Sequence, residues 1–389
     1  MFVFFNLYLP IMKIRSSLKA FLIFSLSIFS ITESQASPLL TIGDDLNVFF
    51  NGSTTIGYDS NITLDDSDEA SDVFLLMKPG IEFDYGRGNA NLNAIIGANI
   101  IAYLDESDYD STTGFFRLKG GYEGARLSLN SHASIEEIES NTNNINVVRE
   151  LVRRRVYTFG IDGNYELTEK VELESGFNFI STDYRNFEDT FNDEDRYSIP
   201  FNIYYAFSPK LDLSAGYRYT RTDVTDDNDR NDHFFNLGFR GEVAPKLEGQ
   251  LKAGYRYRDI SGDSNTGTLG IDSDLRWAFS PLTSFTLGAK RDFDTGGRGE
   301  SLRTTETNFK VIHAFTPLIS GEGTLRYKNY TYTDSSREDD NYSYGATLFY
   351  QPIEYLAFSF GYTFLDNDSN LRGASYRAHR VLFTIAVRY

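Results

Sequence analysis

The sequence predicts an all-β fold: a transmembrane antiparallel up-and-down β-barrel of about 18 strands, with 16 as the alternative. Three observations predict it. Alternating apolar and polar residues fill most of the chain after residue 36, short turns alternate with longer acidic loops, and five prolines recur at intervals of 36, 36, 36 and 35 residues. Proline has no amide proton for a sheet ladder and fixes its own φ, so a periodic proline marks a tight turn between strands. The five are Pro209, Pro245, Pro281, Pro317 and Pro352.

The first 36 residues are predicted to be a secretory signal peptide. A basic stretch with Lys13, Arg15 and Lys19 precedes an apolar run over residues 20–31, and Ser34-Gln35-Ala36 has the small-x-small order of a cleavage site. The alternative is a membrane helix, but the run is too short to span a bilayer. Residues 37–389 then form a single barrel domain, and both Met1 and Met12 stay open as the start of translation.

The composition limits the classes of partner and of binding site that the protein can have. Removing three basic residues and Glu33 with the leader changes the formal charge from −18 to about −20, which disfavours nucleic acid. The chain has no cysteine, so disulfides and thiolate metal sites are excluded. Aromatic residues are abundant, with 26 Tyr and 32 Phe, although the charged fraction is 24%. This combination suits amphipathic strands.

Eighteen segments show strand periodicity, with apolar side chains on one face and polar ones on the other. An even number returns both ends of the barrel to the periplasm. The segments are 46–58, 73–85, 92–100, 116–122, 127–135, 157–165, 171–180, 197–207, 211–219, 235–239, 247–257, 269–279, 285–293, 305–315, 319–327, 342–350, 356–362 and 381–389.

The connections alternate in kind. Short turns are predicted near residues 86–88, 123–124, 168–170 and the five prolines. The longer acidic connections are 64–72, 105–111, 187–195, 225–232, 334–340 and 365–370. Outer-membrane barrels have short periplasmic turns and longer external loops, so all five prolines are expected at the periplasmic rim.

Aromatic residues are placed as two girdles. Phe207, Phe279, Phe315 and Tyr350 each precede a turn proline by two residues, whereas Tyr219, Tyr257 and Tyr327 follow one by ten to twelve. At roughly 3.3 Å per residue and a tilt of about 40°, eight to ten residues rise about 20 to 25 Å, the height of the apolar band of such barrels. A soluble sandwich or propeller is the alternative, but near-constant hairpin length and an amphipathic last strand ending at Tyr389 favour the membrane.

Several strings carry a family resemblance: Gly57-Tyr58-Asp59-Ser60-Asn61-Ile62, the repeated Phe-Ser-Pro and Gly-Tyr-Arg-Tyr, and the terminal Tyr389. Over nearly the whole mature chain they resemble the bacterial outer-membrane family called putative β-barrel porin 2. Members are often associated with capsule or exopolysaccharide loci, so the resemblance implies passage of carbohydrate through the outer membrane. It brings no catalytic or binding residues with it.

Basic side chains recur on the polar strand faces and are candidates for the pore lining: Arg218, Arg240, Arg256, Arg276, Lys290 and Arg326. The acidic Asp212, Glu248 and Glu322 lie closer to the prolines. These offsets predict an acidic tier near the periplasm and a basic tier further out, which would favour an anionic solute. The alternative, which we favour, is a ladder of cross-strand ion pairs that stiffens the wall.

Three other features of the sequence bear on function. Residues 136–149 are the longest candidate for an inward-folded loop, and the following Arg153-Arg154-Arg155 either narrows the lumen or, as we favour, belongs to the wall. The acidic loops lack the order of a dedicated calcium site, so solvated loops are favoured. His132, His233, His313 and His379 lie on separate hairpins, and neighbours such as Asp232 and His233 point to opposite faces of a strand, so no enzyme is expected.

The sequence therefore predicts a channel in the outer membrane of a Gram-negative bacterium, linked to polysaccharide export or carbohydrate passage. The alternative is a structural or interaction barrel with a blocked lumen. Expected partners are outer-membrane lipid, lipopolysaccharide and a polysaccharide or small hydrophilic solute, with no nucleic acid and no cofactor.

Overall fold

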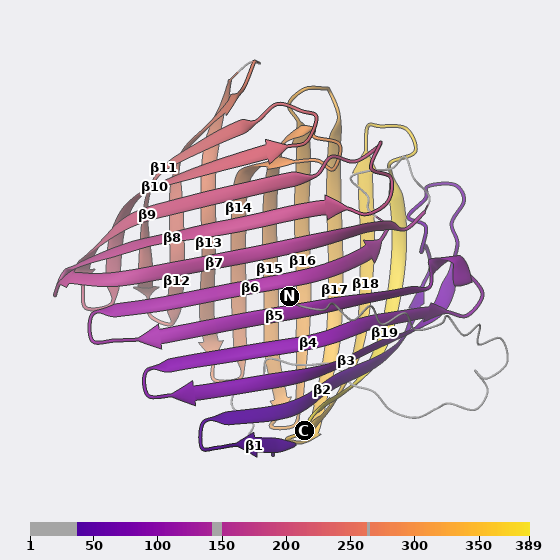
Figure 1. Cartoon of the computed structure of the whole chain (residues 1–389), viewed down its shortest axis with the longest axis horizontal. Helices are drawn as coiled ribbons and strands as arrows, with labels where there is room; N and C mark the ends of the chain where they lie inside the picture. Colours follow the sequence, from indigo (N-terminus) through magenta and orange to yellow (C-terminus); the bar gives the residue numbers. More distant parts are fainter. Residues whose placement is uncertain (1–36, 142–149, 263–264) are drawn as a thin grey trace, which may run out of the picture.

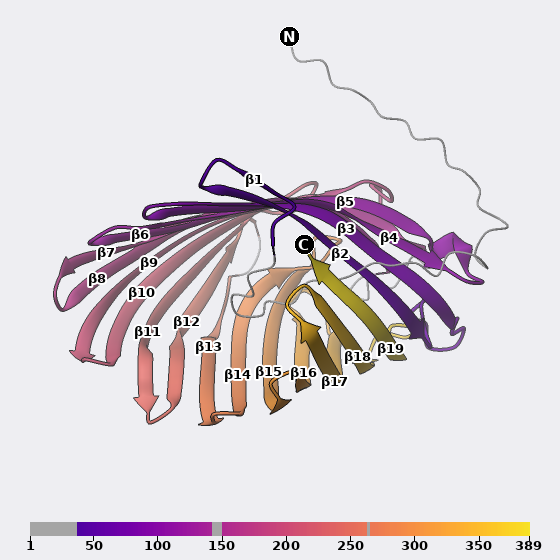
Figure 2. The same ribbon diagram turned by 90° about the horizontal axis from the view of Figure 1, so that it is seen from below.

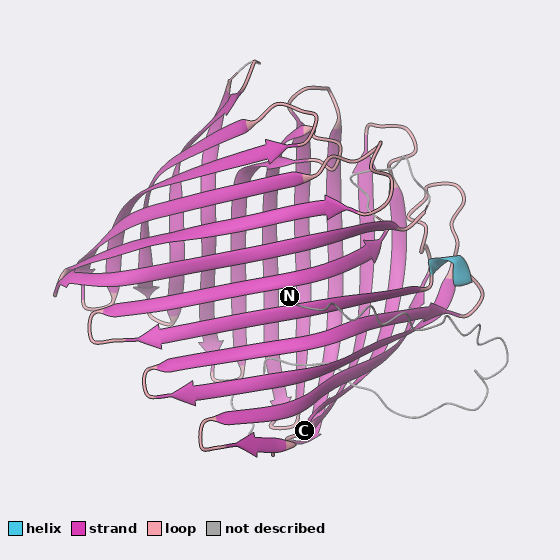
Figure 3. Ribbon diagram, in the orientation of Figure 1, coloured by secondary structure: helices cyan, strands magenta, loops and turns pink. Residues whose placement is uncertain are grey.

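The protein is a closed barrel of 18 antiparallel strands, as predicted (Figures 1 and 3). The computed structural model describes residues 37–141, 150–262 and 265–389. The predicted signal peptide lies outside these residues. Each strand from β2 onward pairs with the next, and β19 pairs with β2 to close the ring. Seen from below, β2–β9 form one side of the wall and β11–β19 the other (Figure 2).

The strands are longer than predicted, and each predicted segment lies in one of them, except that the last segment ends one residue beyond β19. Their bounds are β2 (Leu46–Asp59), β3 (Asp72–Arg87), β4 (Ala90–Tyr103), β5 (Ser111–Glu123), β6 (Leu127–Ser140), β7 (Val152–Thr168), β8 (Val171–Tyr184), β9 (Glu194–Ser208), β10 (Leu211–Val224), β11 (Arg230–Ala244), β12 (Leu247–Ile260), β13 (Thr266–Ser280), β14 (Thr283–Thr295), β15 (Ser301–Thr316), β16 (Ile319–Tyr332), β17 (Glu338–Ile353), β18 (Leu356–Ser369) and β19 (Tyr376–Arg388). A short β1 (Leu40–Ile42) pairs with the first residues of β2. One 3-10 turn, η1 (Ser107–Tyr109), lies between β4 and β5.

Turns of two or three residues join the strands at one end of the barrel. Pro209, Pro245, Pro281 and Pro317 lie in these turns as predicted. Pro352 does not: it lies in the last residues of β17, and Glu354-Tyr355 make the turn. In three of the proline turns a hydroxyl accepts the second turn residue's N–H, since Ser208, Ser280 and Thr316 bond Lys210, Leu282 and Leu318 at 3.2–3.3 Å. This side-chain cap favours the turn over continued strand.

The opposite end carries connections of five to twelve residues. Two expectations are corrected there. Residues 365–369 belong to β18, because Asp366 and Asn367 pair with β17 and β19. The predicted inward loop 136–149 begins later, since Glu136–Ser140 pair with β7; residues 142–149 lie outside the described part of the chain. Because short turns are periplasmic in such barrels, this end is extracellular.

The outer face of the wall is an apolar belt. Leu237 of β11 is 70% exposed, as are Phe235 on the same strand (56%) and Tyr255 (56%) and Leu269 (57%) on the next two strands. The predicted periplasmic girdle residues Phe207, Phe279, Phe315 and Tyr350 are also exposed. No helix in the described residues is long and apolar enough to cross a membrane. Exposed apolar strands on a closed sheet fit a lipid environment, where every backbone group must be paired within the protein.

Replacing an outward residue tests this belt. We expect Leu237→Arg to lower the free energy of unfolding of the lipid-refolded barrel by about 2–4 kcal/mol, because the charge enters hydrocarbon. Gln250→Arg is the control. Gln250 lies on the inner face of the neighbouring strand β12, so this change should lower the free energy of unfolding much less. Urea titration in phosphatidylcholine vesicles followed by tryptophan fluorescence measures both. Equal effects would contradict the assigned orientation.

Candidate functional site: the inner face and its extracellular clamp

The inner face is identified by contacts between strands that are not neighbours. Arg240 of β11 lies 2.7 Å from Glu172 of β8, and Lys252 of β12 lies 3.4 Å from Glu174 of β8. Side chains three or four strands apart can meet only across the concave side of a curved sheet. The polar residues that alternate with the apolar belt therefore face the interior.

Five of the six predicted basic residues lie within 4 Å of a carboxylate. The pairs are Arg218–Asp292 at 2.6 Å, Arg256–Asp292 at 2.7 Å, Lys290–Asp292 at 3.9 Å, Arg240–Asp212 at 2.9 Å and Arg326–Glu306 at 3.4 Å. The sixth, Arg276, is exposed and lies directly opposite Glu248 in the β12–β13 register. Arg240 and Arg276 thus share the periplasmic level with Asp212 and Glu248. The predicted separation into an acidic and a basic tier is wrong, because cross-strand pairing mixes the signs.

The wall changes at the extracellular end of β14. Pairing between β13 and β14 runs from the periplasmic turn to Ile271 and Arg291. Beyond this point, which we call the seam, β13 continues with β12 to Thr266, and β14 continues with β15 to Thr295. We call residues 292–304 the outer hairpin. It comprises the end of β14, the loop 296–300 and the start of β15.

Arg258 of β12 reaches across the seam to the end of β14 and the start of β15. Its side chain is 1% exposed and forms a fork with Asp232, with Nε–Oδ1 at 2.6 Å and Nη2–Oδ2 at 2.7 Å. Its Nη1 donates to the carbonyl oxygen of Asp294 at 2.8 Å and to Ser301 Oγ at 3.0 Å. One buried arginine therefore ties β11, β12, β14 and β15 together.

Two carboxylates of β14 complete the attachment. Asp292 binds Arg218 of β10 and Arg256 of β12, and Asp294 binds Arg196 of β9 at 2.8 Å. The loop adds backbone contacts, because Gly297 O accepts from Asn192 N–H at 2.9 Å and Gly299 O accepts from Arg230. We call the ionic residues the clamp: Arg196, Arg218, Arg256, Arg258, Asp232, Asp292 and Asp294.

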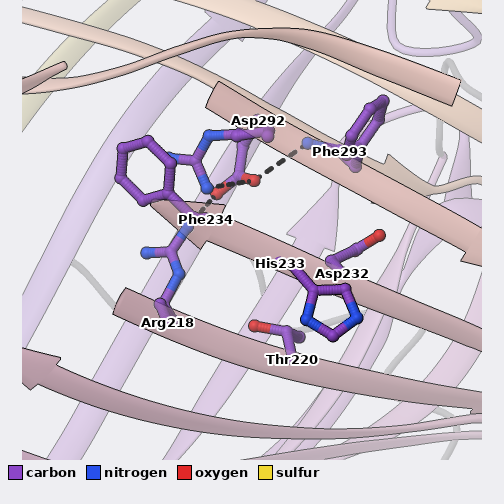
Figure 4. A pocket seen from close by; sticks show the side chains of 8 residues that line it. Arg218, Thr220, Asp232, His233, Phe234, Asp292 and Phe293 are labelled. Atoms are coloured by element: carbon purple, nitrogen blue, oxygen red, sulfur yellow. Dashed lines mark hydrogen bonds and ion pairs between the residues drawn. The ribbon is translucent and has the colours of Figure 1, made fainter. Parts of the chain in front are cut away.

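The clamp is tightly packed. Figure 4 shows Arg218, Asp232, Phe234 and Asp292 around a cavity of about 10 Å³, space for about one water molecule. The guanidinium of Arg256 lies 3.6 Å from the centre of the Phe234 ring. Gly270 makes room for it, since a Cβ there would lie 2.5 Å from Arg256 Nε. The outer hairpin is therefore seated directly against the inner face of β10–β12.

A larger hollow lies at the periplasmic mouth. Its volume is about 300 Å³, and its lining includes Arg126, Asn164, Glu166, Glu172 and Arg240. Arg240 is already bound to Glu172 and Asp212. The hollow is polar and carries both signs of charge, like the rest of the inner face.

Histidines are not gathered into a catalytic group. His233, His313 and His379 each share a hydrogen bond of 2.8–2.9 Å with a hydroxyl on an adjacent strand, from Tyr217, Thr283 and Tyr362. Asp232 is bound to Arg258 on the inner face, whereas His233 lies among the outward tyrosines. Arg153 and Arg155 lie in β7 and bind Glu137 of β6. Among the described residues, no group of three or more acidic or histidine side chains could hold a metal.

Family comparison agrees with this architecture. Residues 229–389 match the family model described as putative beta-barrel porin 2, and residues 140–293 match that described as outer membrane protein beta-barrel domain. The protein is an outer-membrane β-barrel. The resemblance to the putative β-barrel porin 2 family is thereby confirmed over residues 229–389. No curated protein matches it.

Three solved structures illustrate the similarity of fold. They are OpdK from Pseudomonas aeruginosa (11% identity, TM-score 0.48, covering 88% of this chain and 99% of that one), OpdF from the same organism in complex with glucuronate (10%, 0.49, 89% and 98%) and a BenF-like porin from Pseudomonas fluorescens Pf-5 (9%, 0.49, 89% and 99%). Each of these proteins differs from this chain at about nine in ten aligned positions. What they bind is therefore not inferred for this protein.

Removing the buried arginine of the clamp should destabilise the barrel. We expect Arg258→Met to lower the free energy of unfolding by about 3–5 kcal/mol, because Asp232 keeps its charge in a buried site without its partner. Arg326→Met, which breaks the exposed pair with Glu306, is the matched control and should cost less than about 1 kcal/mol. Denaturant unfolding of the detergent-refolded proteins compares the two. Similar losses would show that the clamp carries no special share of stability.

Proposed function

We propose that the barrel is a channel through which small hydrophilic solutes cross the outer membrane. The observation that carries the proposal is the closed 18-strand wall with an apolar outer face and a charged inner face. Barrels with this number of strands are wide enough for an aqueous path. Ion pairs along the wall hold the polar side chains against it.

Three of the predicted basic residues are the best placed to meet a solute. The side chains of Lys290 and Arg326 are 57% and 59% exposed, and Arg276 is exposed as well. Arg218 and Arg240 are partly covered by their carboxylates. Arg256 is 2% exposed and belongs to the clamp, so we leave it out of the solute path. Mixed charges at each level favour weak ion selectivity.

A more specific version of this proposal is that the transported solute is a polysaccharide. The similarity to the putative β-barrel porin 2 family supports it, and a polar wall suits a hydroxyl-rich chain. Deleting the gene and measuring surface polysaccharide tests it. If the deletion leaves the amount of surface polysaccharide unchanged but abolishes the uptake of small sugars, the export role is refuted and the small-solute channel is retained.

The clamp favours a second candidate, a structural barrel with a blocked lumen. The outer hairpin lies across the inner face of β9–β12 and narrows the extracellular mouth. Loops carrying many carboxylates would then serve contact with the environment.

Planar-bilayer recording separates the two candidates. We expect the purified, folded protein to give discrete conductance steps in 1 M KCl, because the inner face is charged and solvated. A heat-denatured sample is the control. Correctly folded protein, shown by heat-modifiable gel migration, that never gives steps would refute the channel and favour the blocked barrel.

Ion selectivity tests the three exposed basic residues. We expect the triple variant Arg276→Gln, Lys290→Gln and Arg326→Gln to shift the reversal potential in a KCl gradient toward cation selectivity, because their carboxylate neighbours keep their charge. Lys170→Gln with Lys246→Gln, in periplasmic turns, is the control and should shift it less. An unchanged reversal potential would remove the three residues from the pore lining.

A further inference from the structure

We propose that the outer hairpin sets the size limit of the pore at its extracellular mouth, with a narrow position held by the clamp and a wide position paired to β13. The inference rests on the proposed channel function and names the element that decides which solutes pass. Three observations support the inference: the contacts of the clamp, the strand register at the seam, and the residues on either side of the seam.

The clamp shortens the circumference of the barrel. β9 and β14 are five strands apart, which is about 24 Å along a wall with roughly 4.8 Å between strands. Arg196 of β9 and Asp294 of β14 nevertheless lie 2.8 Å apart. At this height the outer hairpin therefore crosses the interior and leaves the ends of β10, β11, β12 and β13 outside the enclosed contour. The narrow mouth is a direct result of the ion pairs.

The sequence on both sides of the seam fits a second arrangement. Ile271 pairs with Arg291, so two further steps of the same register place Leu269 opposite Phe293. Leu269 is 57% exposed on the outer face, whereas Phe293 is 5% exposed within the clamp. In the extended register both side chains would join the apolar belt. Asp292 and Asp294 would then face the interior with the other charges.

The two positions give the outer hairpin different partners. In the narrow position Arg258 and Arg230 donate to the carbonyl oxygens of Asp294 and Gly299, and Asp292 and Asp294 bind arginines of β9, β10 and β12. In the wide position residues 293–296 would pair with residues 266–269 of β13, which pair only with β12 in the narrow position. Since each position has its own set of contacts and buries different side chains, the hairpin has two defined states, and a solute of larger cross-section passes only in the wide one.

Opposed disulfides test this directly, because the chain contains no cysteine. Leu269→Cys with Phe293→Cys would lock the wide position, since opposed residues of an antiparallel pair have Cα atoms about 4.5–5.5 Å apart. Asn192→Cys with Gly297→Cys would lock the narrow position, because these residues already share a backbone hydrogen bond of 2.9 Å. Disulfide formation is followed by intact mass after mild oxidation, and each pore by single-channel conductance and by liposome swelling in mono-, di- and trisaccharides.

We expect the oxidised 269–293 pair to raise conductance at least twofold and to admit the trisaccharide, and reduction to restore the original values. The oxidised 192–297 pair should keep the narrow size limit. Asp292→Asn with Asp294→Asn should speed formation of the 269–293 disulfide severalfold, because the clamp loses its charges.

Three outcomes overturn the inference. The 269–293 disulfide fails to form even with both aspartates replaced, or it forms without changing the conductance of a conducting wild type, or the 192–297 disulfide widens the pore. A silent wild type that conducts once the 269–293 pair is oxidised would support the hairpin as the barrier. Silence in every oxidised and reduced form would instead refute the proposed channel.

Discussion

Closure of the sheet is the constraint on which the whole structure depends. A membrane offers no hydrogen-bond partner to a free strand edge, so each edge must be paired within the protein. The pairing of β19 with β2 provides this for the ring, and β1 extends the pairing along the start of β2. At the seam, where β14 turns away from β13, Arg258 bonds the end of β14 from across the interior. This departure from regular pairing is therefore also a place where buried charge is concentrated.

A barrel of this kind turns the usual arrangement of a folded protein inside out. Leu237 and its neighbours face outward, so the packing of an apolar core contributes little, and the buried hydrophobic clusters in the described residues are small groups such as Leu302 with Tyr330 and Tyr332. Interstrand hydrogen bonds and ion pairs across the inner face take that role. Arg240, held between Glu172 and Asp212, ties β8, β10 and β11 together and limits how far the wall can flex.

Most of the fold could be predicted because its determinants are local. Alternation of apolar and polar residues identifies each strand, and the spacing of Pro209, Pro245, Pro281 and Pro317 identifies the hairpin. The position of Pro352 placed the last turn two residues too early, because strand β17 continues past this proline. The clamp could not be predicted in the same way. Arg256 and Arg258 stand two residues apart on one strand, as do Asp292 and Asp294 on another, so each pair shares a face; that these two strands meet across the interior depends on the register of the whole sheet.

The hydroxyl-capped turns make the 36-residue hairpin a self-contained building unit. Ser208, Ser280 and Thr316 close their turns with bonds to residues two positions away, so each of these turns is formed within its own hairpin. Insertion or loss of one such unit would change the circumference by two strands while leaving both chain ends on the periplasmic side. The bore of this architecture can therefore evolve in whole steps, by duplication or deletion of short gene segments, without redesign of the remaining wall.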